Sequence, residues 1–426
     1  LRTDSDTAVM LDAVHQHGAL RWLVSDWLLE NGFYRPISSI SIALDYALYG
    51  ESGWGFRLTN WLLMVLTALG VWALVRLYAR LVESPSADGL PVAVGVAFSL
   101  QQMGLTEGLT RWSAWWFVAA SVLAVWVGQV RAGQAGQDTG ARALLERARD
   151  FRLSLPLLLG IGALFWGFDR LLTTEYTRLI TWVPSRTALL GTAFGVWAMY
   201  ALLRGAMRRR WSWLALGGGL YLFALGSYEQ PITLIALLGA FAFWRRHEWG
   251  IWGARAFAVA ALCGVLVFAL RFTLIPAEPS TYQQQQLRSS LFGPAMGYLT
   301  ELVPPFGQWQ YWSSVGTHFE VLLVDKTGWD NLAGTLLYLG VLVAVVRWRR
   351  LLGGAWLWHA LTFLPMAFLH FFEHYMYLPQ VGKTLFDVGL IAWGLQQLSG
   401  LLGRDAEVLR DRPLVRLAAA DKRQVD

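Results

Sequence analysis

Charged residues and cysteine are both scarce in this chain of 426 residues. Asp, Glu, Lys and Arg make up 15% of the sequence, whereas a soluble domain normally carries about 25%. The single cysteine, Cys263, lies inside an apolar run, so we expect a small core residue that says little about the redox compartment. P-loop, dinucleotide-binding and paired-cysteine motifs are absent as well, which excludes the nucleotide and zinc sites that those motifs form.

Apolar runs that are long enough to cross a bilayer recur along nearly the whole chain, which is 55% hydrophobic. Many of the 24 Trp and 14 Tyr residues flank these runs, as in an aromatic belt at the membrane surface. The sequence thus predicts an all-α, polytopic integral membrane protein with about eleven spans. The predicted spans are roughly 58–79, 91–106, 113–130, 154–170, 187–205, 212–226, 231–244, 255–274, 332–346, 354–371 and 384–402.

Arginine is concentrated in alternate loops between the predicted spans and in the C-terminal tail. The positive-inside rule places these loops in the cytoplasm, which explains the net charge of +6 better than a nucleic-acid partner does. In a cytoplasmic (inner) membrane, residues 1–57 and the loop 275–331 are then external. Residues 58–402 form the transmembrane domain, and 403–426 form a cytoplasmic C-terminal tail. The external N-terminus predicts one further helix before Leu1, which would bring the full protein to twelve spans.

The first external segment, 1–57, is expected to lie on the membrane surface and to contain no span. Its first apolar stretch follows the spacing of a helix with one apolar face, through Leu20, Leu23, Val24, Trp27 and Leu28. A second short amphipathic stretch follows Pro36 and places Ile40, Leu44 and Leu48 on one side. Two interfacial helices are therefore predicted here.

Acidic residues of the short loops gather on the predicted external side, which points to a functional site there. A carboxylate beside the end of an apolar helix is costly unless it is paired or faces water. A set of such residues is harder to explain as ordinary loop charge than any single member. The residues, with their basic neighbours, are Glu107 with Arg111, Glu175 with Arg178 and Arg186, Glu229, and Glu373 with His374.

Asp4 and Asp6 stand at the head of the first external segment. Two carboxylates two residues apart can share a divalent metal such as Mg²⁺ or Mn²⁺, or one can act as a general base toward a substrate hydroxyl. The alternative interpretation is a solvated chain end, or the cap of the following helix.

His370, Glu373 and His374 spell the H-x-x-E-H motif of inverted zinc peptidases. That chemistry needs both histidines on one helical face and a further acidic ligand downstream. The candidate outside the cytoplasmic tail is Asp387, and Pro379 follows the motif at the mouth of a span. A chance match is therefore the preferred interpretation.

A series of outer segments carries a family resemblance. The segments are NGFYRPISS at 31–39, LDYALYG at 44–50, FRLTN at 56–60, WVPSRT at 182–187, SYE at 227–229 and EHYMYLP at 373–379. Taken in order, they resemble the GT-C class of membrane glycosyltransferases. The closest pattern is that of the tetratricopeptide-bearing protein O-mannosyltransferases and their bacterial relatives.

This resemblance implies that the chain moves a sugar from a polyprenyl-phosphate donor, which enters from the membrane lipids, to an acceptor on the non-cytoplasmic face. It also implies that an acid of the first external loop, Asp4 or Asp6, is the catalytic base or a metal ligand. The donor phosphate would be bound by Arg186, with Arg35, Arg111, Arg178 and His374 as further candidates. Glu107, Glu229, Glu373 and Tyr375 would support the acceptor, and Glu229 or Glu107 could instead hold Arg186.

The chain departs from the family pattern at four positions. Tyr228 replaces a lysine, His374 replaces an arginine, Ala188 replaces an aspartate, and Leu63 or Met64 stands where a histidine is expected. No tetratricopeptide tail follows the last predicted span in this chain. Two alternatives therefore stay open: a non-catalytic structural or accessory subunit with membrane protein partners, and a lipid or solute transporter.

Overall fold

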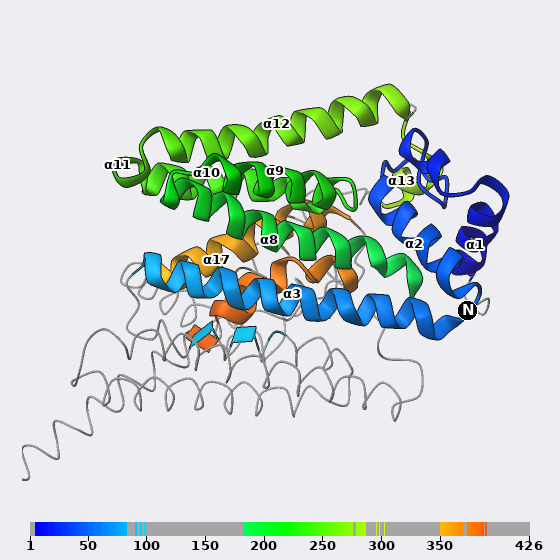
Figure 1. Ribbon diagram of the computed structural model, residues 1–426, viewed down its shortest axis with the longest axis horizontal. Helices are drawn as coiled ribbons and strands as arrows, with labels where there is room; N and C mark the ends of the chain where they lie inside the picture. Colours follow the sequence, from blue (N-terminus) through cyan, green and yellow to red (C-terminus); the bar gives the residue numbers. More distant parts are fainter. Residues whose placement is uncertain are drawn as a thin grey trace, which may run out of the picture.

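The computed structural model describes residues 5–82, 182–275, 278–286, 350–369 and 373–386, and isolated positions at 90–91, 94–95, 98, 295, 298, 302 and 388–389. These residues form helices joined by short turns, and the longest helices run along a common direction (Figure 1). The predicted spans 113–130, 154–170 and 332–346 lie outside the described residues, as do most of 91–106 and 384–402. Predictions for Asp4, Glu107, Arg111, Glu175, Arg178, His370, Asp387, the tail 403–426 and the side chain of Glu373 also lie outside them.

Four described helices are long and apolar enough to cross a membrane. They are α3 (Gly53–Leu81), the helix Val183–Arg208 made of η2 (Val183–Ser185) and α8 (Arg186–Arg208), α12 (Ile251–Leu274), and the helix Arg350–Phe368 made of α17 (Arg350–Phe363) and η5 (Leu364–Phe368). Two shorter apolar helices are α9 (Trp211–Leu225) and Gln230–Trp244, which joins η3 (Gln230–Thr233) to α10 (Leu234–Trp244). A helix thus lies at six of the predicted spans, while the totals of eleven and twelve spans stay predictions.

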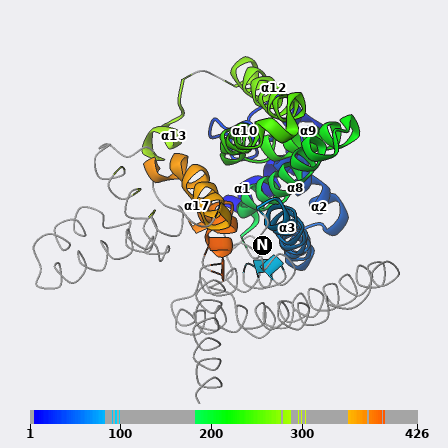
Figure 2. The same ribbon diagram turned by 90° about the vertical axis from the view of Figure 1, so that its left-hand side faces the viewer.

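Helix α8 is the centre of the described bundle. It contacts α3 on one side and α9 on the other, while α12 packs on α9 and α10. Figure 2 shows this order from the side, with α3 and α12 at opposite edges of the group. Glycines allow the closest approach, since a Cβ at Gly217 would lie 2.7 Å from Leu202 of α8 and one at Gly218 would lie 2.8 Å from Val259 of α12.

The N-terminal segment packs against one end of this bundle. It contains α1 (Ser5–His17), the 3-10 turn η1 (Leu20–Leu23) and α2 (Pro36–Tyr49), and α13 (Thr281–Gln286) lies beside them in Figure 1. Its own small core includes Met10, Trp22, Trp27, Ile42 and Phe56. The remaining short elements are α11 (Arg246–Trp249) and η6 (Glu373–Met376).

The predicted amphipathic helix over residues 20–28 is wrong, because the chain leaves the 3-10 turn at Leu23 and forms a loop. The Asp26 carboxylate accepts backbone N–H groups from Trp27 at 2.7 Å, Gly32 at 2.6 Å and Phe33 at 3.0 Å, and this closes residues 26–33 into a compact loop. The apolar residues are divided as a result: Trp27 and Leu28 are buried, whereas Leu20, Leu23 and Val24 are exposed.

The second amphipathic prediction is confirmed as a helix. Helix α2 begins at Pro36, whose fixed φ suits the first helical position, and the predicted apolar residues Leu44 and Leu48 are exposed on it. The opposite face buries Ile42, Ala43 and Asp45. Contact of this exposed face with the membrane surface stays a prediction.

The two ends of the bundle differ in charge. At one end, Tyr78 donates a hydrogen bond to the Arg350 carbonyl at 2.6 Å, and Arg245 donates to the Leu81 carbonyl, so the end of α3, the turn after α10 and the start of α17 meet. Glu248 is the acidic residue of this basic end within the described residues. Its arginines are Arg76, Arg80, Arg204, Arg208, Arg209, Arg210, Arg245, Arg246, Arg255 and Arg350. The elements of the opposite, N-terminal end carry the remaining acids together with fewer arginines. The acids are Asp6, Asp12, Asp26, Glu30, Asp45, Glu51, Glu229 and Glu278, and the arginines are Arg21, Arg35, Arg57, Arg186 and Arg271.

Candidate functional site

An ion pair between Arg35 and Glu229 forms the centre of the candidate site at the N-terminal end of the bundle. Arg35 Nε donates to both carboxylate oxygens of Glu229 at 3.1 Å, and Nη2 donates to Oε2 at 2.7 Å. The side chains are 11% and 30% exposed, respectively. A forked, charge-assisted pair of this kind fixes the plane of the guanidinium.

Two proline-led turns bring this pair together. Arg35 directly precedes Pro36 at the start of α2, and Glu229 precedes Gln230 and Pro231 at the start of η3. The turns are joined by backbone contacts, since the Ile37 N–H donates to the Gly226 carbonyl at 3.0 Å and the Ser38 hydroxyl donates to the Ser227 carbonyl at 3.0 Å. The position of the ion pair is therefore set by main-chain geometry.

Aromatic rings surround the Arg35 guanidinium. Its Cζ lies 4.2 Å from the ring centre of Phe33, 4.9 Å from that of Tyr228 and 5.1 Å from that of Trp27. Burial lowers the pKa of Arg35, but the charge and hydrogen bonds of Glu229 outweigh burial and leave that pKa above its ordinary value. Nη1 has no hydrogen-bond partner among the described residues, so the guanidinium can still donate to an anion.

His374 and Tyr375 lie on the same side of the bundle. The His374 ring centre lies 4.7 Å from that of Tyr375, 5.4 Å from that of Trp182 and 6.4 Å from that of Tyr228. Burial raises the pKa of Tyr375, Tyr282 and Glu229 raise it further, and the charge of Arg35 lowers it. These charges act on Tyr375 because η6, which contains it, lies near the Arg35–Glu229 pair.

Asp6 is close enough to influence the same group of residues. Burial raises the pKa of Tyr282, the charge of Arg35 lowers it, and the charge of Asp6 raises it. The Tyr282 ring stands edge-on to Phe33 with a centroid distance of 6.3 Å. Asp6, in the first turn of α1, is therefore close enough to Tyr282 for its charge to act there, as the charge of Arg35 does.

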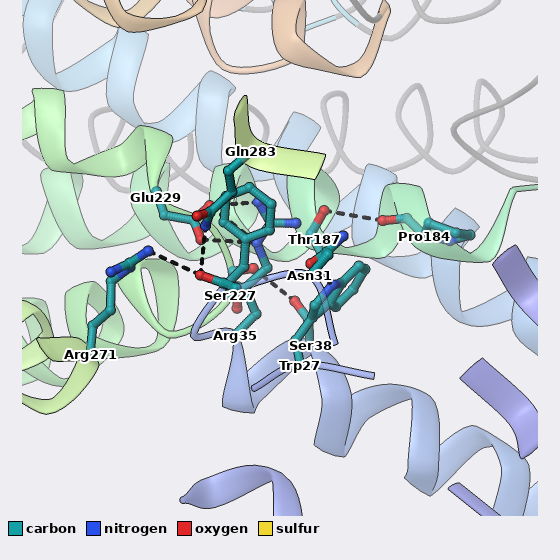
Figure 3. Close-up of polar contacts among 12 residues, drawn as sticks. Trp27, Asn31, Arg35, Ser38, Pro184, Thr187, Ser227, Glu229, Arg271 and Gln283 are labelled. Atoms are coloured by element: carbon teal, nitrogen blue, oxygen red, sulfur yellow. Dashed lines mark hydrogen bonds and ion pairs between the residues drawn. The ribbon is translucent and has the colours of Figure 1, made fainter. Parts of the chain in front are cut away.

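The segment after α12 is fastened over the loop that precedes Arg35. The Gly32 carbonyl accepts from Arg271 at 3.0 Å and from Gln283 at 2.7 Å, and the Asn31 carbonyl accepts from the Ser280 hydroxyl at 2.7 Å. Figure 3 shows Arg271 and Gln283 reaching this loop from different elements, with Arg35 and Glu229 beside them. Residues 283–286 are four consecutive glutamines, and nothing in the sequence indicated this contact.

Arg186 occupies a different environment from the predicted one. Its side chain is 0% exposed, and Nη2 lies 2.7 Å from an Asp45 oxygen. It also donates to Asn60, to the Ser41 hydroxyl at 3.1 Å and to the Phe56 carbonyl at 3.0 Å. Each guanidinium nitrogen is thus engaged inside the protein, which does not fit the predicted role as the donor-phosphate ligand. Glu229 is paired with Arg35, and Glu107, the other carboxylate predicted to hold Arg186, lies outside the described residues.

The described residues test neither the predicted metal site at Asp4 and Asp6 nor the H-x-x-E-H motif, for which a chance match is the preferred interpretation. Among the described residues, no group of three or more His, Cys, Asp or Glu side chains is positioned to hold a metal ion. Asp4, His370 and Asp387 lie outside the described residues. The Mg²⁺ or Mn²⁺ site at Asp4 and Asp6 therefore stays a prediction.

Comparison of the chain with protein-family models, with curated proteins and with solved structures found no match.

Proposed function

We propose that this chain is a GT-C-like membrane glycosyltransferase that moves a sugar from a polyprenyl-phosphate donor to an acceptor hydroxyl. The observation that carries the proposal is the convergence of segments that resemble that family. Arg35 belongs to the segment 31–39, Glu229 to 227–229, Trp182 to 182–187, and His374 and Tyr375 to 373–379. Their side chains form one neighbourhood although the segments are far apart in the sequence.

Arg35 is the proposed ligand of the donor phosphate. Its pair with Glu229 holds the guanidinium plane, and Nη1 supplies donors for a phosphate oxygen. His374 stands where the family has an arginine, and it can add a second positive charge when it is protonated. In this assignment Arg186 is a structural residue that holds α8 to α2 and α3.

Asp6, together with Asp4, is the proposed general base. The acceptor oxygen attacks the anomeric carbon, the bond between that carbon and the phosphate oxygen breaks, and the electron pair leaves with the phosphate. The acceptor proton passes to the aspartate carboxylate. A Mg²⁺ or Mn²⁺ ion, if held by Asp4 and Asp6, would add positive charge beside the same phosphate.

The location of the site supports a lipid-linked donor. The site lies at the end of helices that are long and apolar enough to cross a membrane, opposite the basic end. If the basic end faces the cytoplasm, the site opens on the non-cytoplasmic face. A polyprenyl chain could then remain in the bilayer while its phosphate reaches Arg35.

The test is transfer of radiolabelled mannose from polyprenyl-phosphate mannose by the purified chain in nanodiscs, with other polyprenyl-phosphate hexoses as further donors. Arg35→Gln should lower transfer by about 100-fold, because it removes a charged donor from the leaving group. Arg35→Lys should lower transfer by about tenfold, since lysine keeps the positive charge but lacks the forked hydrogen-bond donors of the guanidinium. Transfer within twofold of wild type in Arg35→Gln would contradict the proposal.

Two controls separate catalysis from folding. Arg35→Gln combined with Glu229→Gln leaves no uncompensated charge, so this variant should fold and still fail to transfer sugar. Arg21→Gln removes an exposed arginine that lies 3.7 Å from Glu30 at the same end of the molecule, and it should transfer at the wild-type rate.

A further inference from the structure

The start of α12 carries an arginine stacked on tryptophans at the basic end of the molecule. The Arg255 Cζ lies 4.7 Å from the ring centre of Trp252 and 5.2 Å from that of Trp211. The two rings are edge-on, with centroids 5.6 Å apart. No salt bridge to Arg255 is present within the described residues, so the aromatic faces hold the guanidinium while leaving its charge uncompensated.

A second set of arginines adjoins this stack. The turn between α8 and α9 exposes Arg208, Arg209 and Arg210 directly before Trp211. Arg209 has a left-handed backbone with φ 54°, and its Nη2 donates to the Glu248 carbonyl at 3.2 Å, which fastens this turn to the turn that precedes α12. Positive charge from two turns is thereby concentrated beside Trp211 and Arg255.

The acid of this region does not neutralise the cluster. The Glu248 carboxylate is paired with Arg245, which itself stacks on Trp244. Arg246 is exposed on the same turn. The surface made by Arg208, Arg209, Arg210, Arg246 and Arg255 therefore keeps a strong excess of positive charge.

Apolar surface continues directly from these arginines along α12. Trp211 is 56% exposed and Ile251 is 63% exposed, and further along the helix Leu262 and Val265 are also largely exposed. A free inorganic anion would use only the charged part of such a surface. A phospholipid would use both parts, with its phosphate at the arginines and its acyl chains along the helix.

We propose that the arginine–tryptophan cluster formed by Arg209, Trp211, Trp252 and Arg255 is a binding site for an anionic phospholipid. Arg255 and Arg209 bind the negatively charged headgroup phosphate. Trp211 and Trp252 lie at the depth where the headgroup meets the acyl chains. The site is separate from the Arg35–Glu229 region, since the two lie at opposite ends of the bundle.

Native mass spectrometry of the purified chain in detergent, titrated with phosphatidylglycerol or phosphatidylcholine, tests this site. Wild type should bind phosphatidylglycerol at least about tenfold more tightly than phosphatidylcholine, because the phosphate charge of phosphatidylglycerol is not offset by a choline cation. Arg255→Gln combined with Arg209→Gln should remove most of this preference, and Arg255→Lys should keep part of it. Equal binding of the two lipids, or an unchanged preference in the double variant, would overturn the proposal.

The matched control is Arg21→Gln, because Arg21 also lies over a tryptophan ring, that of Trp22, at 5.8 Å, but at the N-terminal end and beside Glu30. This variant loses the same charge and should keep the full lipid preference. Inorganic phosphate at millimolar concentration should leave the bound phosphatidylglycerol in place. Displacement by inorganic phosphate would identify a site for free anions and overturn the assignment to lipid.

Discussion

Arg35 and Arg186 show how two arginines of similar sequence context can have different roles. Each stands next to a proline-containing turn at the N-terminal end, and each has a carboxylate partner. Arg186 is fully enclosed by Asp45, Asn60, Ser41 and the Phe56 carbonyl, whereas Arg35 keeps partial exposure and a nitrogen outside its ion pair. Enclosure therefore makes Arg186 a structural residue and leaves Arg35 as the candidate ligand.

The sequence could not have distinguished these two arginines. The partners of Arg186 lie 126 to 145 residues away along the chain, and Glu229 lies 194 residues from Arg35. Which carboxylate meets which guanidinium is decided by helix packing. The sequence did predict correctly that both arginines, with Glu229 and His374, belong to the same end of the molecule.

Replacing Arg186 should reduce stability rather than abolish a binding contact. Arg186→Met leaves Asp45 charged and buried, which costs about 3–5 kcal/mol, so the thermal unfolding midpoint in detergent should fall clearly. Arg186→Met combined with Asp45→Leu removes both charges and should recover most of this loss. An Arg186→Met variant that unfolds like wild type but transfers no sugar would restore the phosphate-binding assignment.

At the scale of elements, long apolar runs predicted the helices well. Away from water, the backbone N–H and C=O groups of such a run can be hydrogen-bonded within the run only if it forms a helix. The six apolar helices of the described part of the chain lie where spans were predicted. The loop at 24–34 was missed because an apolar periodicity was interpreted as a helix. The hydrogen bonds that Asp26 accepts from Gly32 and Phe33 close this loop, and the sequence has no periodic pattern that would indicate them.

The close contact between α8 and α9 gives a prediction with an internal control. In Gly217→Ala the new Cβ would lie 2.7 Å from the Leu202 side chain and 3.0 Å from its backbone nitrogen, so the helices must separate. We expect a cost of about 1–3 kcal/mol, measured as a lower unfolding midpoint. Gly219→Ala, two residues along the same helix, meets nothing within 4 Å and should be neutral or slightly stabilising. Equal midpoints for the two variants would contradict this packing.

At the scale of the whole molecule, the main feature is the difference in charge between the two ends of the helix bundle. The arginines of loops that are distant in sequence meet at one end, as contacts of Arg245 and Arg350 show. The sequence predicted this pattern from the alternation of loops alone, because each helix reverses the chain direction. It could not predict that α13 would return to the loop before Arg35, since that contact depends on Gln283 and Ser280.

The orientation can be measured with single cysteines in a Cys263→Ala background. Leu20→Cys lies at the N-terminal end and Arg209→Cys at the basic end, and both positions are exposed. A membrane-impermeant maleimide should label Leu20→Cys in intact cells, and should label Arg209→Cys only after permeabilisation. Labelling of both positions from one side would contradict the proposed arrangement.

The central claim is that the N-terminal end performs sugar transfer with an aspartate of α1 or of the residues just before it. The direct measurement is the rate of labelled-sugar transfer from a polyprenyl-phosphate donor by the purified chain in nanodiscs. Wild type and the exposed α1 variant Asp12→Asn should transfer sugar equally well, whereas Asp4→Asn combined with Asp6→Asn should be slower by about 10²–10⁴-fold. Unchanged transfer in the double variant would contradict the assignment of the base, and no transfer by wild type from any donor of this class would contradict the proposed function.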